Sequence, residues 1–318
     1  MTGYVSDYKG NTYKLPVLLD WELCYGWGEP CDAFQAVFLY EPEQMDMLSG
    51  AVRFWAEHEG ERVFYGVVDE FEARAGKEGM LAVLRGRGLA ALLMDNEAEA
   101  AQYGFASLDF ILDRHVYPWG VTQVKAEGFS GGAPFRVESG DSQWKVLRDY
   151  ARLCFGVRPR FTKEGVLLLT REPGDTRIID GRTAVISQTY RQRRYGVITS
   201  VLVKTRGGWT SRIVENTDFT AKGGNCRRVL NVPRSTGYDA MGYAGEYQIR
   251  QSELDSVLCR LTLPALFAAY PGDLVRINKS PLGITGEYCV LESRCWANSR
   301  DAGTEISLVR QEDGYVAF

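Results

Sequence analysis

Histidine is scarce in this sequence, and the two copies, His58 and His115, are too few for a zinc site at any familiar spacing. The seven cysteines are odd in number and scattered without a Cys-x-x-Cys pair, which is typical of thiols that stay reduced in a cytoplasm. A basic segment followed by an apolar core is missing from the first residues, so a secretory signal is not expected. No apolar run approaches the roughly 18 residues that span a bilayer. We therefore expect no metal, no cofactor, no disulfide framework and no membrane partner.

A large excess of either charge is also missing. Lysine and arginine number 37 against 41 aspartates and glutamates, so the net charge is −4 and no global basic field attracts nucleic acid. Local basic clusters occur at 191–194 and 227–228, and we interpret them as solvated strand ends or loops. Specific nucleic-acid binding is not expected.

Proline is sparse, with 11 residues, whereas glycine (34) and the aromatic residues (17 Tyr, 14 Phe and 7 Trp) are abundant. Frequent turns and many aromatic side chains favour sheets over helical bundles. The fold class that we predict is mainly β (β+α).

Three segments differ in pattern. Residues 1–88 alternate as short strands at 15–19, 34–40, 50–56, 62–72 and 80–86, separated by tight polar turns. Residues 89–180 mix helices with short strands. Residues 181–318 return to strands, and the polar, Gly-rich stretch 216–247 predicts long loops. We expect a first β domain, an α/β insert and a second β domain with these bounds.

The middle segment carries clear helix signals. Ser107 is a suitable N-cap for a helix with Leu108, Ile111, Leu112 and His115 on one face, ending before Pro118. A further helix is predicted from residue 141 or 142 to Cys154, with Gly156 as its C-terminal stop.

Two strings look catalytic at first sight. Gly128-Phe129-Ser130-Gly131-Gly132 fits the Gly-x-Ser-x-Gly nucleophile elbow, which needs a strand before and a helix after the serine. Ala133 and Pro134 follow here, so a loop is the preferred interpretation. Gly86-Arg87-Gly88-Leu89-Ala90-Ala91 resembles a dinucleotide-binding turn but has no βαβ unit around it, and we interpret it as a tight strand-to-helix turn.

The titratable candidates have structural explanations as well. His58 is expected in an acidic turn facing solvent, and His115 is expected packed on its helix. The acidic pairs Asp69 with Glu70 and Glu97 with Glu99 fit a strand end and an exposed turn without catalysis. We assign no catalytic, cofactor-binding or metal-binding residue and predict that the chain is not an enzyme.

Four strings carry a family resemblance. They are Val63 to Glu70, Leu81 to Asn96, Phe135 to Leu147, and the pair formed by Pro271 to Ile277 and Gly286 to Val290. In this order they resemble the late control gene D family of phage tail baseplate hub proteins, which is related to hubs of contractile tails, prophage-like particles and type VI secretion spikes. The resemblance covers roughly residues 15–312, and 216–247 matches nothing in it.

The resemblance implies two related β-barrel domains bridged by an α/β portion, assembling as a homotrimer. Three chains with two similar barrels each would form a pseudo-sixfold ring that adapts a hexameric tail tube to a trimeric spike. The implied partners are the tail tube protein, the spike protein and other baseplate proteins, with the tape measure protein as a further candidate. The implied location is the baseplate of a phage, of a bacteriocin or of another contractile injection particle, assembled in the cytoplasm of the bacterial host.

Two other functions remain open at this point. One is a cell-wall hydrolase at the tail tip, which would require an acidic pair or a Cys–His pair in a cleft. The other is a carbohydrate-binding tail-tip module, for which the platforms would be Trp21, Trp27, Trp55 or Trp209.

Overall fold

The computed structural model describes residues 1–26, 32–77, 79–232, 234, 237–254 and 256–310. Strands dominate this part of the chain, with 21 strands against six α-helices and two short 3-10 helices. The mainly β fold class is therefore confirmed. None of the helices in these ranges is both long and apolar enough to cross a bilayer.

The first part of the chain is built from antiparallel strands in which buried and exposed residues alternate. The alternation follows from the period of two, which turns successive side chains to opposite faces. The predicted strand at 15–19 begins later, at Leu18, and the other predicted strands of this part are present. The elements are β1 (Thr2–Asp7), β2 (Thr12–Lys14), β3 (Leu18–Gly26), β4 (Ala33–Leu39), η1 (Pro42–Gln44), α1 (Met45–Ser49), β5 (Ala51–His58), β6 (Glu61–Gly76) and β7 (Gly79–Gly88).

The middle part contains the two predicted helices with the predicted caps. Ser107 Oγ accepts a hydrogen bond from Phe110 N at 3.2 Å, and Ser142 Oγ accepts one from Lys145 N at 3.1 Å. Gly156 ends the second helix in the left-handed region, at φ 65°. The elements are α2 (Ala91–Met94), β8 (Ala101–Ser107), α3 (Leu108–His115), η2 (Tyr117–Trp119), β9 (Val124–Ala126), β10 (Gly132–Val137), α4 (Gln143–Phe155), β11 (Arg160–Phe161), β12 (Leu167–Leu169) and β13 (Thr176–Ile179).

The last part returns to strands around a small α/β unit. Its elements are β14 (Ser187–Gln192), β15 (Ser200–Thr205), β16 (Ser211–Glu215), α5 (Thr217–Ala221), β17 (Arg227–Val232), α6 (Tyr238–Leu254), β18 (Val257–Leu263), β19 (Leu274–Ile277), β20 (Gly286–Ala297) and β21 (Ala302–Arg310).

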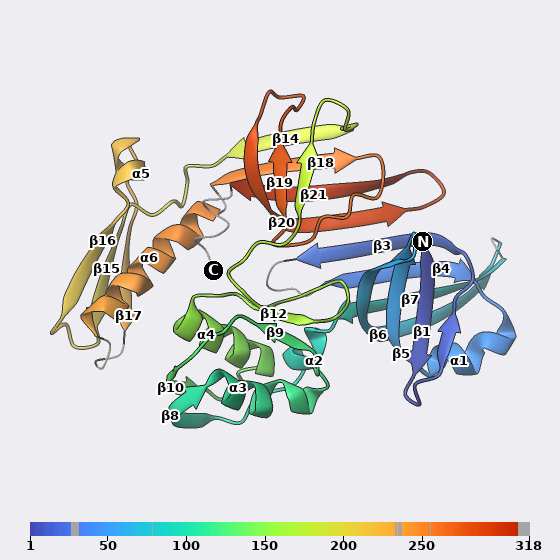
Figure 1. The fold of residues 1–318 in the computed structure, drawn as a ribbon, viewed down its shortest axis with the longest axis horizontal. Helices are drawn as coiled ribbons and strands as arrows, with labels where there is room; N and C mark the ends of the chain where they lie inside the picture. The colour runs from blue at the N-terminus through green and yellow to red at the C-terminus, as the bar shows by residue number, and fades with distance from the viewer. Residues whose placement is uncertain (27–31, 78, 233, 235–236, 255, 311–318) are drawn as a thin grey trace.

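The expectation of long loops at 216–247 is wrong. This stretch contains α5, β17 and most of the 17-residue helix α6. Strand β17 pairs in parallel with β15, and β16 pairs antiparallel with β15 on its other side. We call residues 197–254 the lateral unit, because it lies at the left-hand end of the molecule in Figure 1.

One large sheet joins the first and last parts of the chain. It has 13 strands, with β14-β18-β21-β20-β3-β4-β7-β6-β5-β1-β2 as its main path. The connection is the antiparallel pairing of β3 with β20, seen at the centre of Figure 1. Over the described strands the pairing forms an open path from β14 to β2 and closes neither of the two expected barrels.

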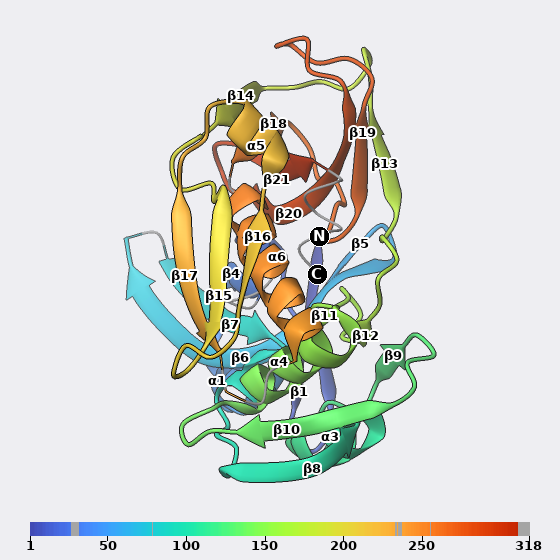
Figure 2. The ribbon, with the colours of Figure 1, turned by 90° about the vertical axis from the view of Figure 1, so that its left-hand side faces the viewer.

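Separate apolar cores support these layers. The largest lies in the middle part, where α3 and α4 pack with β8, β10 and β12 around Trp144, Leu147 and Tyr150. A second core, around Phe34, Phe54 and Phe64, fills the inner face of the first strands. A third lies under β18–β21, and a fourth lies between α6 and β15. Figure 2 shows the middle part below the sheet, with β8 and β10 at its lower edge.

Candidate functional site

The two motif candidates lie in structural settings that fit neither catalytic motif. Ser130 is exposed in the connection between β9 and β10, and a strand rather than a helix begins at Gly132. The nucleophile elbow is therefore not formed. Gly86 to Ala91 runs from the end of β7 into α2, as the strand-to-helix interpretation predicted, and its neighbour β6 is antiparallel.

His115 is a buried structural histidine with both ring nitrogens paired. Its Nδ1 lies 2.7 Å from Gln143 Oε1, and its Nε2 lies 3.2 Å from the hydroxyl of Tyr103. Because the amide oxygen of Gln143 can only accept, Nδ1 carries the proton and Nε2 accepts from Tyr103. Gln143 Nε2 in turn donates to the carbonyl of Glu97 at 2.9 Å. The chain of bonds joins α3, β8 and α4, which is a positioning role and not a reactive one.

Burial lowers the pKa of His115, and the charge of Arg114 acts in the same direction. Because the pKa of His115 is lower in the native state, the ring takes up a proton more readily in the unfolded chain. The free energy of unfolding therefore decreases as the pH falls through about 6.5, the ordinary pKa of histidine. We expect the urea midpoint of the wild-type chain to fall between pH 7.5 and 5. His115→Gln should show a smaller fall over the same interval. If the urea midpoint falls equally in the two proteins, the pH dependence does not come from His115.

Of the remaining charged candidates, the side chains of His58, Asp69, Glu70 and Glu99 are in ion pairs on the surface. His58 ends β5, with its Nε2 4.0 Å from the carboxylate of Glu59. Arg87 donates to Asp69 at 2.7 Å and to Asp95 at 2.7 Å, and its hydrogen bonds lower the pKa of Asp95. In the described part of the chain, no group of three or more His, Cys, Asp and Glu side chains could hold a metal ion.

The tryptophan candidates differ in exposure. Trp55 stacks on Tyr4 with 5.3 Å between ring centroids, and Trp21 packs against the core of the first strands. Trp27 lies outside the described residues. Trp209 is 80% exposed at the tip of the β15–β16 hairpin, with the guanidinium of Arg234 5.8 Å from its ring. Among the described candidates, Trp209 has the most exposed side chain.

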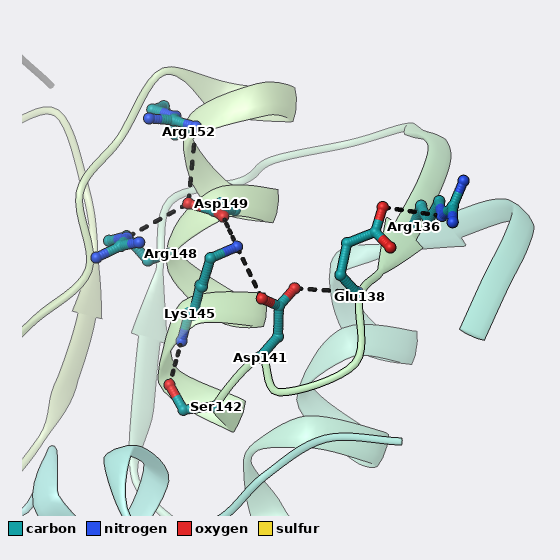
Figure 3. A network of polar contacts seen from close by, with 8 residues as sticks. All are labelled: Arg136, Glu138, Asp141, Ser142, Lys145, Arg148, Asp149 and Arg152. Atoms are coloured by element: carbon teal, nitrogen blue, oxygen red, sulfur yellow. Dashed lines mark hydrogen bonds and ion pairs between the residues drawn. The ribbon is translucent and has the colours of Figure 1, made fainter. Parts of the chain in front are cut away.

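The turn into α4 contains a network of charged side chains (Figure 3). Lys145 Nζ lies 3.1 Å from Asp141 and 2.8 Å from Asp149. Asp149 also meets Arg148 at 3.3 Å and Arg152 at 3.7 Å. The hydrogen bonds to Asp149 and Asp141 raise the pKa of Lys145. These contacts orient the start of α4.

A row of polar side chains crosses the sheet on its outer face. Arg260 Nε lies 3.6 Å from Glu305, Arg294 is paired with Glu22, and Arg85 donates to Gln35 at 3.0 Å and to Glu70 at 3.1 Å. Cross-strand neighbours on one face of a sheet are close enough to interact in this way. The polar row spans seven neighbouring strands, and its members are Arg260, Glu305, Arg294, Glu22, Gln35, Arg85 and Glu70.

All three parts of the chain meet beside the β3–β20 pairing. The ring of Tyr25 is edge-on to Tyr270 at 5.1 Å, and Lys163 Nζ lies 5.6 Å from the centroid of the Tyr270 ring. A cavity of about 30 Å³, room for one or two water molecules, lies among these residues, Asp32 and Trp144. The indole N–H of Trp144 has no hydrogen-bond partner among the described residues, and burial raises the pKa of the Asp32 carboxyl.

A wider groove of about 770 Å³ separates the middle part from the lateral unit. It lies between α4 and α6, where the guanidinium of Arg152 is 4.8 Å from the ring of Tyr247. Leu153 and Tyr243 are 62% and 71% exposed along it. This groove was not predicted, because helix α6 was not expected from the sequence.

No family model matches the sequence, and no curated protein matches it. Comparison with solved structures nevertheless shows that its fold is that of bacteriophage-type tail proteins. It is similar to the tail protein from Neisseria meningitidis MC58, with a TM-score of 0.81 and 17% identity over 99% of this chain and 98% of that one. It is also similar to the 43 kDa tail protein of prophage MuSo2 from Shewanella oneidensis, with a TM-score of 0.79 and 19% identity over 98% of this chain and 99% of that one.

A more distant similarity extends to secretion machinery. A component of the E. coli type VI secretion system, described as structurally similar to the T4 tail proteins gp27 and gp5, matches with a TM-score of 0.59 and 10% identity. The match covers 94% of this chain and 74% of that one. The expected likeness to phage tail proteins is thus confirmed, whereas the two closed barrels that the resemblance implies are not found among the described strands.

Proposed function

We propose that this chain is a structural component of a phage-type tail, the baseplate hub between tail tube and spike. The observation that carries the proposal is the likeness to two tail proteins over at least 98% of both chains. Proteins that share a fold over their whole length need not share a function, so the proposal also depends on the surfaces of this chain.

The joined sheet supports a mechanical role. The β3–β20 pairing and the polar row join the first and last parts into one rigid sheet. The contact between Lys163 and the ring of Tyr270 holds the middle part against this sheet. Such a sheet transmits force without bending at a linker. In the proposal, segments 1–88 and 181–318 supply two related positions per chain, and segment 89–180 bridges them. Three chains then offer six positions to a tube and three to a spike.

The proposed partners are two further copies of the chain, the tail tube protein, the spike protein and other baseplate proteins. The proposed place is the baseplate of a tail particle assembled in the host cytoplasm. The chain acts by position and shape, and catalysis has no part in the proposal.

The first experiment is the native mass of the purified chain over a wide concentration range, with electron microscopy of the largest species. We expect a species of three times 35.6 kDa that forms a closed ring. A chain that remains monomeric throughout contradicts the ring. Release of sugars or peptides from purified cell walls contradicts the structural role, and an active-site search would then begin at the groove between α4 and α6.

A further inference from the structure

Charge is strongly segregated along this nearly neutral chain. Residues 1–100 hold 18 aspartates and glutamates against eight lysines and arginines. The lateral unit, residues 197–254, holds eight lysines and arginines against five aspartates and glutamates. The net charge of −4 therefore conceals an acidic first third and a basic lateral unit. Segregation of this kind creates complementary fields on two different surfaces of one molecule.

The basic surface is the outer face of the three-stranded sheet β16-β15-β17. Helix α6 covers the other face, where Val201, Val203 and Met241 are buried. On the outer face, Ile213 and Val229 stand on either side of Leu202 in one cross-strand row. Ile213 is 58% exposed and Val229 is 53% exposed. No described element of the chain packs over this row, and Figure 1 shows the three strands at the free left-hand end of the molecule.

Charged side chains flank this apolar row. Lys204 lies on one side of it, and Arg227 lies with Glu215 on the other. Lys204 and Arg227 form no ion pair with any residue that the structure describes. We call the row with these charges the basic face.

The acidic surface is at the opposite end of the molecule. After β4 ends, η1 and α1 present Glu41, Glu43 and Asp46, all exposed. None of these three carboxylates is in an ion pair within the described ranges. Beside them, Leu39, Met45 and Met80 are 55%, 45% and 43% exposed. We call these six residues the acidic end. In Figure 1, α1 lies at the far right and the basic face at the far left of the longest axis.

We propose that the basic face of one copy of this chain docks on the acidic end of the next copy, head to tail. The inference rests on the proposed ring and names the surfaces that close it. Each surface combines exposed apolar side chains with unpaired charges of one predominant sign, and the signs are opposite. Two different surfaces at opposite ends of one molecule make a heterologous contact, which produces a ring when the rotation closes. An isologous dimer would instead bring like charges together, which is unfavourable.

Charge reversals on each surface test the docking by sedimentation velocity at low salt. Lys204→Glu with Arg227→Glu alters the basic face, and Glu43→Lys with Asp46→Lys alters the acidic end. We expect each double variant to weaken assembly about tenfold or more. The quadruple variant should recover most of the wild-type affinity, because the charges are exchanged across the contact. Higher ionic strength should weaken the wild-type assembly, since exposed charges are screened.

Mixing the two double variants distinguishes a head-to-tail contact from a symmetric one. The first variant keeps its acidic end and the second keeps its basic face, so contacts between unlike variants are complementary in charge and contacts between like variants are repulsive. A ring of three copies needs at least one contact between like variants and cannot close. We expect open complexes that contain the two variants in equal numbers, under conditions where each variant alone is a monomer. A mixture that stays monomeric, or a quadruple variant that stays as weak as the double variants, overturns the docking.

Glu59→Lys with Glu99→Lys is the matched control, because it makes the same change of charge at carboxylates that are 86% and 90% exposed, away from both surfaces. Its assembly should equal that of the wild type, and circular dichroism should show that all variants are folded. If the wild-type chain forms a ring that neither double variant weakens, the docking is wrong and the ring stands. If the wild-type chain forms no ring at all, the hub proposal fails with it.

Discussion

Replacing Gly86 with alanine is expected to unfold the first part of the sheet. A Cβ atom at this position would lie 1.9 Å from the backbone oxygen of Val67 and 2.5 Å from Cε1 of Phe34. The first contact is with the backbone of the paired strand β6, so no change of rotamer can relieve it. On the same pair of strands, a Cβ at Gly66 would lie 2.1 Å from the oxygen of Arg87. We expect a loss of stability of about 3 kcal/mol or more.

The measurement is the urea midpoint followed by near-ultraviolet circular dichroism, which reports the packing of the Phe34, Phe54 and Phe64 rings. Gly104→Ala is the control, because Gly104 also lies in a strand, β8, and a Cβ there meets nothing within 4 Å. The control should stay within about 0.5 kcal/mol of the wild type. A Gly86→Ala protein as stable as the control would show that β6 and β7 can separate freely, and that the glycine has another role.

Truncation of Tyr150 to alanine is expected to cost about 3–5 kcal/mol. Its side chain is fully buried at the centre of the middle core, edge-on to Phe135 at 5.4 Å and to Phe155 at 5.8 Å. Its hydroxyl donates to the carbonyl of Ala106 at 2.7 Å, which fixes β8 against α4. Loss of the ring leaves a cavity that the surrounding strands cannot fill, and it removes the bond as well.

Tyr150→Phe separates these two contributions. It keeps the ring and removes the hydroxyl, so we expect a smaller loss of about 1–3 kcal/mol from the carbonyl left without its donor. Leu153→Ala on the same helix is the control, since Leu153 is 62% exposed and should change stability by less than about 0.5 kcal/mol. Equal losses for the alanine and phenylalanine variants would contradict the cavity argument and assign the whole effect to the hydroxyl.

The helices that the sequence predicted well are those with local capping signals. Ser107, Ser142 and Gly156 act within one turn of their own helices, so their effect can be read without knowledge of the rest of the fold. His115 was likewise placed correctly on the buried face of its helix. What it bonds to could not be predicted, because Gln143 lies 28 residues further along the chain.

The lateral unit shows why the stretch 216–247 was misjudged. Gly242 and Gly245 lower the helix propensity of α6 and made the region look like loops. In the structure a Cβ at Gly245 would lie 2.6 Å from Cγ2 of Val214, so glycine is what lets the helix approach β16 closely. The packing of helix on sheet outweighs the propensity. The alternation in 211–215 and 227–232 was the available signal, weakened by the arginines of both strands.

The sequence by itself determined the mainly β class, the strand periods, the capped helices and the absence of a nucleophile elbow, because each depends on residues a few positions apart. Only the tertiary structure decided that β3 pairs with β20, which brings Glu22 to Arg294 across 272 residues. It also placed the acidic end and the basic face at opposite ends of the molecule (Figure 1). Which strands pair depends on geometry and burial over the whole chain, so the pairing cannot be predicted from a local sequence pattern.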